Sequence, residues 1–428
     1  MVTFHERDPF VAHGPFVARV PEPVWPWQGN WAYLGKNMME GRVWPAAAVD
    51  DQAPSAFDFF VTGGTSKVIG GSTGGQDLFL DTVGTMGLAG WKAMPSMLES
   101  RAGHAAVFVD GKLYVLGGFR IPTGPPPLSL DVLSTVEVYD PSTGQWTQRA
   151  FMPTARHGLA AAAWDSKIYA IGGFGDPGGF AVLEVYDTQT DTWDITHPPM
   201  PNDRSGLAAA VIGDVLYVVG GMGGNEMKAQ TLAAYDLSQR KWEPRNPMPT
   251  GRSHLAAAVM DGKLYAMGGE GVAQFYPADQ SWPYSRPLAD VEVYDPIRDK
   301  WYVAPRMLTP RKGLAAVTLT QEIRYFTSAM PAVFPPNLPH EAQGVPFRSV
   351  GRDERHPLAF GGSPYVHTRK LQQIYAIGGA TTLPGQEEYL ASVEVYPAPL
   401  PNLIVAPKSA KRSGAAQENS RTAKRRRA

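Results

Sequence analysis

The sequence predicts an all-β protein whose chain closes into a ring of six four-stranded blades, a six-bladed β-propeller. An internal repeat of about 50 residues and an unusual composition carry this prediction. The 428 residues include 45 glycines and 39 prolines, and only 18% of them are charged. This composition fits many turns and short strands better than long helices. A period near 50 residues with about four short strands per unit is typical of propeller blades.

Each repeat runs from an arginine through small apolar residues and a tyrosine-bearing apolar segment to two glycines. The clearest copies are RHGLAAAAWDSKIYAIGG (156–173), RAGHAAVFVDGKLYVLGG (101–118), RSGLAAAVIGDVLYVVGG (204–221) and RSHLAAAVMDGKLYAMGG (252–269). In each, the second glycine lies 17 residues after the arginine, and an apolar-Tyr-Asp segment follows whose aspartate precedes a tryptophan by six residues. Degenerate copies begin at Arg42 and Arg311, which makes six blades.

The conserved spacing of the repeat assigns a structural role to each of its parts. Six innermost strands converge on one axis, so they need small side chains, and this crowding overrides the helix propensity of the alanines. The next strand is apolar throughout, as a strand buried between neighbouring blades should be. The Gly-Gly pair permits positive φ and close backbone approach. The repeated arginines could form an anion-binding ring, but their fixed place in the repeat favours a role in tying each blade to the next. We expect the repeated arginines, tyrosines and tryptophans to be structural: Arg42, Arg101, Arg156, Arg204, Arg252, Arg311, Tyr114, Tyr169, Tyr217, Tyr265, Trp146, Trp193, Trp242 and Trp301.

The missing end of the last repeat lies at the start of the chain. The sixth copy lacks its tryptophan, and NWAYLGKNMMEGR supplies Trp31 at the expected distance before Arg42. An N-terminal strand would therefore complete the sixth blade, close the ring and protect its edges. The predicted organisation is an N-terminal arm (1–30), a propeller (31–398) with an insertion in blade six (about 320–369), and a disordered basic tail (399–428).

The Gly-Gly pair, the tyrosine and the tryptophan together resemble the kelch family over roughly residues 31–397. The resemblance implies a kelch-type propeller. In kelch propellers that bind peptides, the mouth of the central channel is lined by residues just after the repeat arginine and just after Gly-Gly. On this chain those positions give the binding candidates Trp44, Phe119, His157, Phe174, Ser205, Met222, Ser253, His254, Glu270 and Lys312, with Arg120 just beyond.

This predicted mouth mixes aromatic and sulfur-containing side chains with a few polar ones. It lacks the arginine cluster expected for an acidic peptide. A ligand held by stacking and a few hydrogen bonds fits it better. Both a protein segment and a small ligand meet that description.

Long loops should crowd the same face as the mouth. They follow Gly118, Gly269 and Gly379, and the second contains the contact candidates Tyr276, Trp282, Tyr284 and Arg286. The alternative is that these aromatic residues bury themselves within their own loop. The insertion in blade six is long enough to be functional, as a lid, a packing patch or a partner arm.

The sequence favours a binding protein over an enzyme, with no catalytic residue, metal or cofactor predicted. Without cysteine, thiolate sites and the cysteine–tyrosine crosslink of copper radical oxidases are excluded. Motifs for serine nucleophiles, phosphate-binding loops and paired-histidine metal sites are missing as well. The alternative is a mutarotase-like sugar enzyme of the six-bladed kelch type, which would need an acid/base pair at the mouth. Glu270 with His254 or Arg120 is the best pair available.

The tail differs in charge from the rest of the chain. From Leu403 onward there are eight Lys/Arg and one Glu, about +7, so the rest is near −8 for a total of −1. Two basic clusters, Lys411-Arg412 and Lys424-Arg425-Arg426-Arg427, resemble a bipartite nuclear import signal. They would equally suit nucleic acid, an acidic protein or an anionic surface. With no signal peptide and no long apolar run, the sequence predicts a cytoplasmic protein, or a nuclear one in a eukaryotic host.

Overall fold

The computed structural model describes residues 30–49, 59–67, 77–87, 90–121, 130–176, 178–223, 229–271, 286–327, 365–383, 386–396 and 404–405. The predictions for the N-terminal arm before residue 30, for Tyr276, Trp282 and Tyr284, and for the basic clusters of the tail lie outside these ranges.

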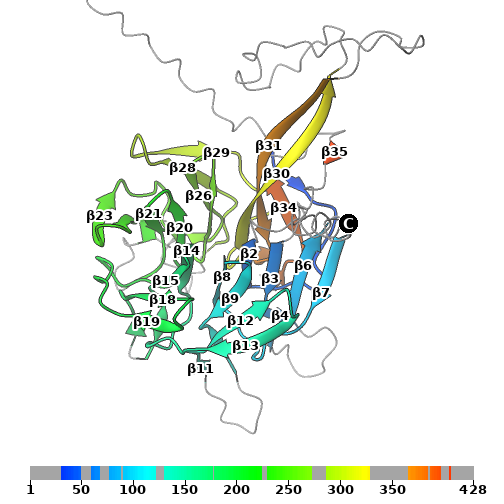
Figure 1. Ribbon diagram of the computed structural model, residues 1–428. Coiled ribbons are helices and arrows are strands. Elements are labelled where there is room, and N and C mark those ends of the chain that lie inside the picture. The colour runs from blue at the N-terminus through cyan, green and yellow to red at the C-terminus, as the bar shows by residue number, and fades with distance from the viewer. Residues whose placement is uncertain are drawn as a thin grey trace, which may run out of the picture.

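Six antiparallel sheets form the blades, and Figure 1 shows them arranged in a ring with β2, β8, β14 and β20 near its centre. Blade 1 contains β2 (Ala46–Val49), β3 (Phe59–Thr62), β6 (Val83–Gly87) and β7 (Gly90–Met94). Blade 2 contains β8 (Ala105–Val109), β9 (Lys112–Leu116), β12 (Val136–Asp140) and β13 (Gln145–Arg149). Blade 3 contains β14 (Ala160–Trp164), β15 (Lys167–Ile171), β18 (Leu183–Asp187) and β19 (Thr192–Asp194). Blade 4 contains β20 (Ala208–Ile212), β21 (Val215–Val219), β22 (Leu232–Asp236) and β23 (Lys241–Arg245). Blade 5 contains β25 (Ala256–Met260), β26 (Lys263–Met267), β28 (Val291–Asp295) and β29 (Lys300–Ala304).

Blade 6 joins the two ends of the propeller. It contains β30 (Ala315–Thr327), β31 (Tyr365–Ile377), β34 (Val393–Tyr396) and, as its outermost strand, β1 (Ala32–Tyr33) from the start of the ring. β1 pairs antiparallel with β34, and the indole of Trp31 donates a hydrogen bond to the carbonyl of Pro305 in blade 5. Because the first strand completes the last blade, the ring is held closed by hydrogen bonds between distant parts of the sequence.

The strands are buried as the repeat predicts. In blades 2 to 5 the second strand has four consecutive buried residues, as in Ile168–Ile171 of β15. The repeat tyrosines Tyr114, Tyr169, Tyr217 and Tyr265 are all buried. Each repeat tryptophan donates its indole N–H to a backbone carbonyl of the neighbouring blade, as Trp193 does to Ala150. The tyrosines are therefore core, and the tryptophans, which are buried or partly buried, link the outer strands of adjacent blades.

The repeat arginines tie neighbouring blades together, as their spacing predicts. The buried guanidinium of Arg101 donates to the carbonyl of Gly117 and pairs with Glu137 of the same blade. The backbone carbonyl of Arg101 accepts a hydrogen bond from Gly64 in blade 1. The same carbonyl contact recurs around the ring, ending with Gly379 and Arg42 between blades 6 and 1. Because all six are buried and their guanidinium groups bond carbonyl oxygens of the blades, these arginines do not form an anion-binding ring.

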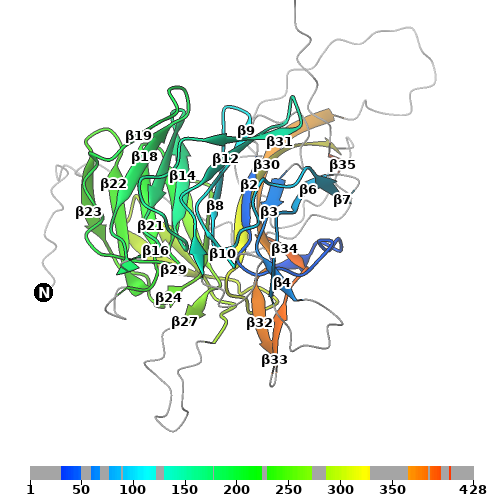
Figure 2. The same ribbon diagram turned by 90° about the horizontal axis from the view of Figure 1, so that it is seen from below.

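Five two-stranded ribbons extend one face of the ring. They are β4 (Thr65–Lys67) with β5 (Asp77–Phe79), β10 (Phe119–Arg120) with β11 (Asp131–Val132), β16 (Phe174–Gly175) with β17 (Gly178–Gly179), β24 (Arg252–Ser253) with β27 (Glu270–Gly271), and β32 (Ala380–Leu383) with β33 (Gln386–Tyr389). Figure 2 shows this face as the lower edge of the molecule.

The insertion of blade 6 leaves the ring on the opposite side from these ribbons. β30 and β31 stay paired as far as Thr327 and Tyr365, so the flanks 320–327 and 365–369 of the predicted insertion are strand. The far end of this hairpin lies at the upper edge of Figure 2. The short strand β35 (Ile404–Val405) pairs with β30 there, so the predicted disorder of the tail from residue 399 is wrong for these two residues. No helix among the described residues is long and apolar enough to span a membrane.

Candidate functional site: the mouth of the central channel

The predicted mouth residues meet in pairs, one pair per blade. The residue after each repeat arginine pairs with the residue after Gly-Gly: Val43 with Thr65, Ala102 with Phe119, His157 with Phe174, Ser205 with Met222, Ser253 with Glu270, and Lys312 with Ala380. Five of the pairs lie where a ribbon leaves its blade, and Ser205 with Met222 lies at the equivalent place in blade 4, for which no ribbon is seen among the described residues. The sequence therefore located the face and its six contributing positions.

A closed ring of backbone hydrogen bonds joins the six blades at the mouth. It runs through the second residue after each repeat arginine: the N–H of Trp44 donates to Gly313, Gly313 to His254, His254 to Gly206, Gly206 to Gly158, Gly158 to Gly103, and Gly103 back to Trp44, at 2.7–3.1 Å. We call these six residues the mouth ring. Every member has a positive φ, between 51° and 60°.

Two members of the mouth ring are not glycine. Trp44 and His254 have φ values of 53° and 51°, a left-handed conformation that disfavours residues with a Cβ. Their rings lie 6.4 Å apart, centroid to centroid. Trp44 leans over Gly313, because a Cβ at Gly313 would lie 2.6 Å from the indole Cδ1; His254 leans over Gly206 in the same way. The two side chains therefore cover part of the ring centre.

The floor of the mouth lies directly beneath the mouth ring. The third residue after each repeat arginine supplies it: Pro45, His104, Leu159, Leu207, Leu255 and Leu314, all buried, line a cavity of about 80 Å³ together with the ring. Because these six side chains are buried, the rim and the ring are the parts of the mouth most open to a ligand.

Aromatic side chains form one side of the rim. Phe119 contacts Trp44 (5.9 Å), Phe79 (5.4 Å) and His157 (4.9 Å), and His157 contacts Phe174 (5.7 Å), all centroid to centroid. Phe174 is 48% exposed, so its ring is open to a ligand. Sequence reasoning missed Phe79, which reaches the rim because β5 pairs with β4; no motif marks it.

Polar side chains form the other side. The Nδ1–H of His254 donates to Glu270 Oε1 at 2.8 Å, and Lys312 Nζ lies 3.5 Å from Glu270 Oε2. Nε2 of His254 therefore points toward Gly206. A Cβ placed on Gly206 would lie 3.0 Å from this nitrogen. Burial and the nearby His254 lower the pKa of His157 below its ordinary value of 6.5. A ligand would thus meet neutral aromatic groups on one side and an oriented imidazole on the other.

The other predicted site residues differ in how far their side chains remain available to a ligand. Arg120 pairs with Asp131 at 3.0 Å and with Glu99 at 3.4 Å, so the guanidinium is committed within its own blade. Met222 is 53% exposed at the rim, Ser205 is half-buried there, and Arg286 is exposed on the outer loop. Among the described residues, no group of three His, Asp or Glu side chains could hold a metal ion.

The Ser253–His254–Glu270 cluster is not arranged for nucleophilic catalysis. Ser253 Oγ lies 3.4 Å from Nδ1 of His254, the same nitrogen that bonds Glu270. A serine nucleophile needs the carboxylate and the hydroxyl on opposite ring nitrogens. The cluster therefore orients the imidazole and leaves Ser253 unactivated.

A family model described as the KLHDC2/KLHL20/DRC7 Kelch-repeats domain matches residues 46–269, just over half of the chain. The chain belongs to the kelch-repeat family. A second model, the Kelch motif, matches residues 251–308.

Curated relatives share only part of their length with this chain. It is 35% identical over 119 residues to human Kelch repeat and BTB domain-containing protein 12, which covers 26% of this chain and 19% of that protein. It is 33% identical over 104 residues to Beta-scruin of Limulus polyphemus, covering 24% and 11%. An F-box/kelch-repeat protein of Arabidopsis thaliana is 32% identical over 108 residues, covering 25% and 27%. The solved structure of YjhT has the same fold, with a TM-score of 0.52, 16% identity, and coverage of 66% of this chain and 90% of that one.

Proposed function

We propose that this kelch propeller is a non-enzymatic recognition module that binds a segment of a partner protein at the mouth of its channel. The observation that carries the proposal is the left-handed backbone of Trp44 and His254 in the mouth ring. Four blades build the same ring with glycine, so the fold does not need these side chains.

The backbone strain at Trp44 and His254 indicates that these side chains are retained for a contact that they make. A left-handed conformation costs roughly 1–2 kcal/mol for a residue with a Cβ, and such strain gathers at ligand clamps. Trp44 and His254 are both half-buried and face the ring centre. A ligand that packs on the indole and bonds the imidazole would account for retaining both.

The rim also defines the chemistry of the segment. The repeat arginines are buried and bonded to carbonyls, and Arg120 is paired, which argues against an acidic motif. The aromatic side fits an aromatic or aliphatic anchor. Nδ1 of His254 is held by Glu270 at 2.8 Å, which leaves the Nε2 edge of the imidazole as its remaining hydrogen-bonding group, so the anchor should neighbour a polar group that can bond it.

Relatives support a module of this kind. Two of them, Kelch repeat and BTB domain-containing protein 12 and the F-box/kelch-repeat protein, join kelch repeats to a BTB domain or an F-box by name. In such proteins the propeller is one unit among others. For this chain we propose that the basic tail is a second contact, for localisation or an acidic partner, in the cytoplasm or in the nucleus of a eukaryotic host.

The proposal is tested by affinity purification from the native host with mass spectrometry. The baits are the wild type, a Trp44→Gly/His254→Gly variant and a chain ending at Pro407. Partners lost with the first variant but kept with the second support recognition at the mouth. Partners that bind equally to the wild type and the mouth variant refute it.

A matched pair of glycine variants sharpens the result. Gly313→Ala places a Cβ 2.6 Å from Trp44, whereas Gly158→Ala strains the same ring position without touching Trp44 or His254. Loss of the partner with Gly313→Ala alone supports the role of Trp44. Equal loss with both would mean that the ring backbone, and not the indole, controls binding.

One observation favours a second candidate, a mutarotase-like sugar enzyme. The His254–Glu270 bond orients an imidazole in the way that general acid/base catalysis requires. Proton NMR of sugar anomer exchange tests it: turnover that Glu270→Gln abolishes in a folded protein would replace the binding proposal, and absence of turnover with neutral and acidic sugars would remove the candidate.

A further inference from the structure

A second cavity lies between blades 3 and 4, away from the mouth. It measures about 380 Å³, and its lining includes Trp164, Tyr169, Trp193, Asp194, His197 and Arg240. Trp164 ends β14 at the hairpin with β15, the end of the blade opposite its Gly-Gly pair. We call this cavity the inter-blade pocket. A volume of this size is within the usual range for small-molecule sites.

In the neighbouring grooves, a turn aspartate fastens adjacent blades together. The fourth residue after the aspartate that ends the third strand is Asp191 in blade 3 and Asp299 in blade 5, both at positive φ. Asp191 accepts hydrogen bonds from the hydroxyl of Tyr186 and the backbone N–H of Ala150 in blade 2. Asp299 accepts from Tyr294 and from a backbone N–H in blade 4 in the same way.

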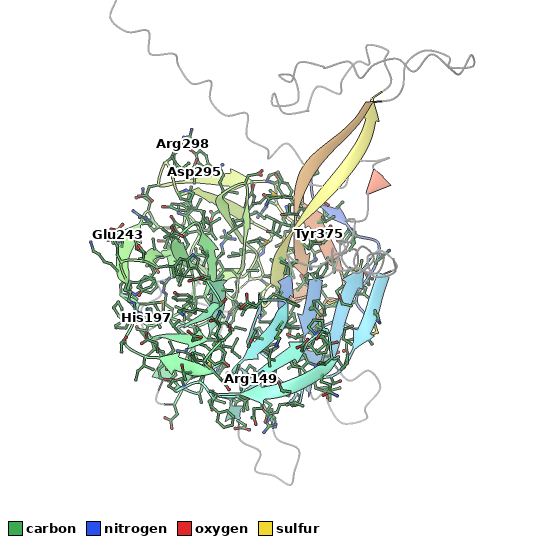
Figure 3. All side chains as sticks on the ribbon, viewed as in Figure 1. Arg149, His197, Glu243, Asp295, Arg298 and Tyr375 are labelled. Atoms are coloured by element: carbon green, nitrogen blue, oxygen red, sulfur yellow. The ribbon has the colours of Figure 1, made fainter. Side chains whose placement is uncertain are left out.

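Blade 4 has Arg240 at that turn position, with φ 54°. Arginine cannot accept these hydrogen bonds. Tyr235 bonds Nδ1 of His197 instead, at 2.7 Å. His197 itself occupies the position of Arg149 in blade 2, because each directly precedes the residue whose carbonyl accepts the next tryptophan N–H. Figure 3 labels both residues on their separate blades.

A third departure from the repeat borders the same cavity. Trp164 ends the first strand of blade 3, where Val109, Ile212 and Met260 end the first strands of blades 2, 4 and 5. Three side chains that blades 2 to 5 do not repeat at the equivalent positions therefore meet in one pocket; at the turn of Arg240, blade 2 has Gly144 and blades 3 and 5 have aspartate. Since the scaffold is built without them elsewhere, their convergence indicates a ligand site.

The charges that line the inter-blade pocket are paired. Lys167 Nζ lies 2.9 Å from Asp187, and Arg240 lies 3.4 Å from Asp194, which also approaches Nε2 of His197. The hydrogen bond from Lys167 lowers the pKa of Asp187 to about 2. Burial lowers the pKa of His197, so the imidazole is neutral at pH 7. Two cations and two anions thus leave the pocket without net charge.

Tyr235, the buried hydrogen-bond partner of His197, keeps its hydroxyl proton at neutral pH. Burial raises the pKa of Tyr235 to about 12, and because Asp194 faces Nε2 of His197 at 3.4 Å, Nδ1 is the nitrogen left to accept from the tyrosine hydroxyl. The neutral imidazole then carries its hydrogen on Nε2, toward Asp194. The pocket accordingly offers donors and acceptors next to indole and phenol faces.

We propose that the inter-blade pocket binds a neutral sugar ring. Each sugar hydroxyl both donates and accepts hydrogen bonds, which suits paired carboxylate and cationic groups. The apolar C–H face of the ring suits the aromatic faces of Trp164 and Trp193. A ligand that carries one charge would meet no unpaired opposite charge, because the charged side chains of the lining are already paired with one another. The site is separate from the mouth and does not rest on the function proposed there.

Saturation-transfer NMR titrations on the full chain test the proposal. The probes are the methyl glycosides of glucose, galactose, mannose and N-acetylglucosamine, with those of glucuronate and glucosamine as charged counterparts. Trp164→Val and Arg240→Asp carry the residue types of equivalent positions in other blades, so both should fold. Arg240→Asp should also restore the turn-aspartate bond to Tyr235 and raise the melting temperature. The Trp44→Gly/His254→Gly variant is the matched control.

We expect at least one neutral glycoside to bind, with tenfold or greater weakening in both pocket variants and less than twofold change in the control. Three results would overturn the proposal. They are no binding by any neutral glycoside, binding that both pocket variants leave unchanged, and charged glycosides that bind as tightly as neutral ones. Binding lost only in the control variant would place the sugar at the mouth and would equally reject this pocket.

Discussion

Replacing His104 by leucine should make the protein less sensitive to acid. His104 is the histidine in the channel floor, where four other blades have leucine. It is 5% exposed, its Nε2 bonds the hydroxyl of Thr62 at 2.8 Å, and its Nδ1 makes no hydrogen bond among the described residues. Burial, with the charges of Arg101 and Arg42, holds its pKa well below the ordinary value of 6.5.

The size of the stability change follows from the proton that the unfolded chain binds at His104 and the folded chain does not. Below pH 6.5 the unfolded chain protonates His104 and the folded chain does not, so folding stability falls as pH falls. Each pH unit in this window costs about 1.4 kcal/mol. Between pH 7.5 and 5.0 the wild type should therefore lose about 2 kcal/mol through His104 alone, a loss that His104→Leu removes.

Urea denaturation followed by tryptophan fluorescence at pH 7.5, 6.5, 5.5 and 5.0 measures this difference. Other histidines, such as His157, are common to both proteins and cancel. A Thr62→Val/His104→Leu variant controls for the lost hydrogen bond, because blades 2 to 6 have an apolar residue at the position of Thr62. If wild type and variant lose stability in parallel down to pH 5.0, the folded protein protonates His104 and the reasoning is refuted.

Three further predictions concern the scaffold, and denaturant unfolding measures each of them. Glu394→Ala should cost about 3–5 kcal/mol, because it leaves the fully buried Arg311 without its carboxylate; a cost below 1 kcal/mol would contradict this. Trp31→Ala should cost about 3–5 kcal/mol by emptying a buried site at the ring closure, and protease cleavage should begin near the N-terminus. Gly117→Ala should destabilise by at least about 1–2 kcal/mol, since φ is 61° and the new Cβ would lie 2.6 Å from the carbonyl oxygen of Arg156; an unchanged midpoint would show that the turn can relax.

The spacing of the repeats predicts the fold because it reports contacts that recur in each blade. The interval from Arg156 to Gly173 fits one hairpin, and the missing tryptophan of the last repeat matches Trp31 at the other end of the chain. The same spacing locates the mouth, since positions next to the repeat arginine and Gly-Gly meet at one face.

What the sequence does not predict depends on contacts between residues that no repeated motif links. The partners of Arg120 are Asp131 and Glu99, and Asp131 lies 11 residues further along the sequence with no motif that marks it. Phe79 reaches the rim only because β5 pairs with β4, and no sequence motif marks this ribbon. The inter-blade pocket is recognised by comparing Arg240 with Asp191 at the same turn position. That comparison becomes informative only when the structure shows that Asp191 binds the preceding blade.

The described part of the blade 6 insertion lies on the opposite side of the ring from the mouth. Its ends, Thr327 and Tyr365, lie on the side of the ring opposite the ribbons, so a lid over the mouth is not what this hairpin is placed to form. β35 joins the first part of the tail to the same hairpin through Ile323 and Arg324. The described parts of the insertion and of the tail therefore lie on the side of the ring away from the mouth. Deleting 328–364 should leave the binding that we propose at the mouth unchanged.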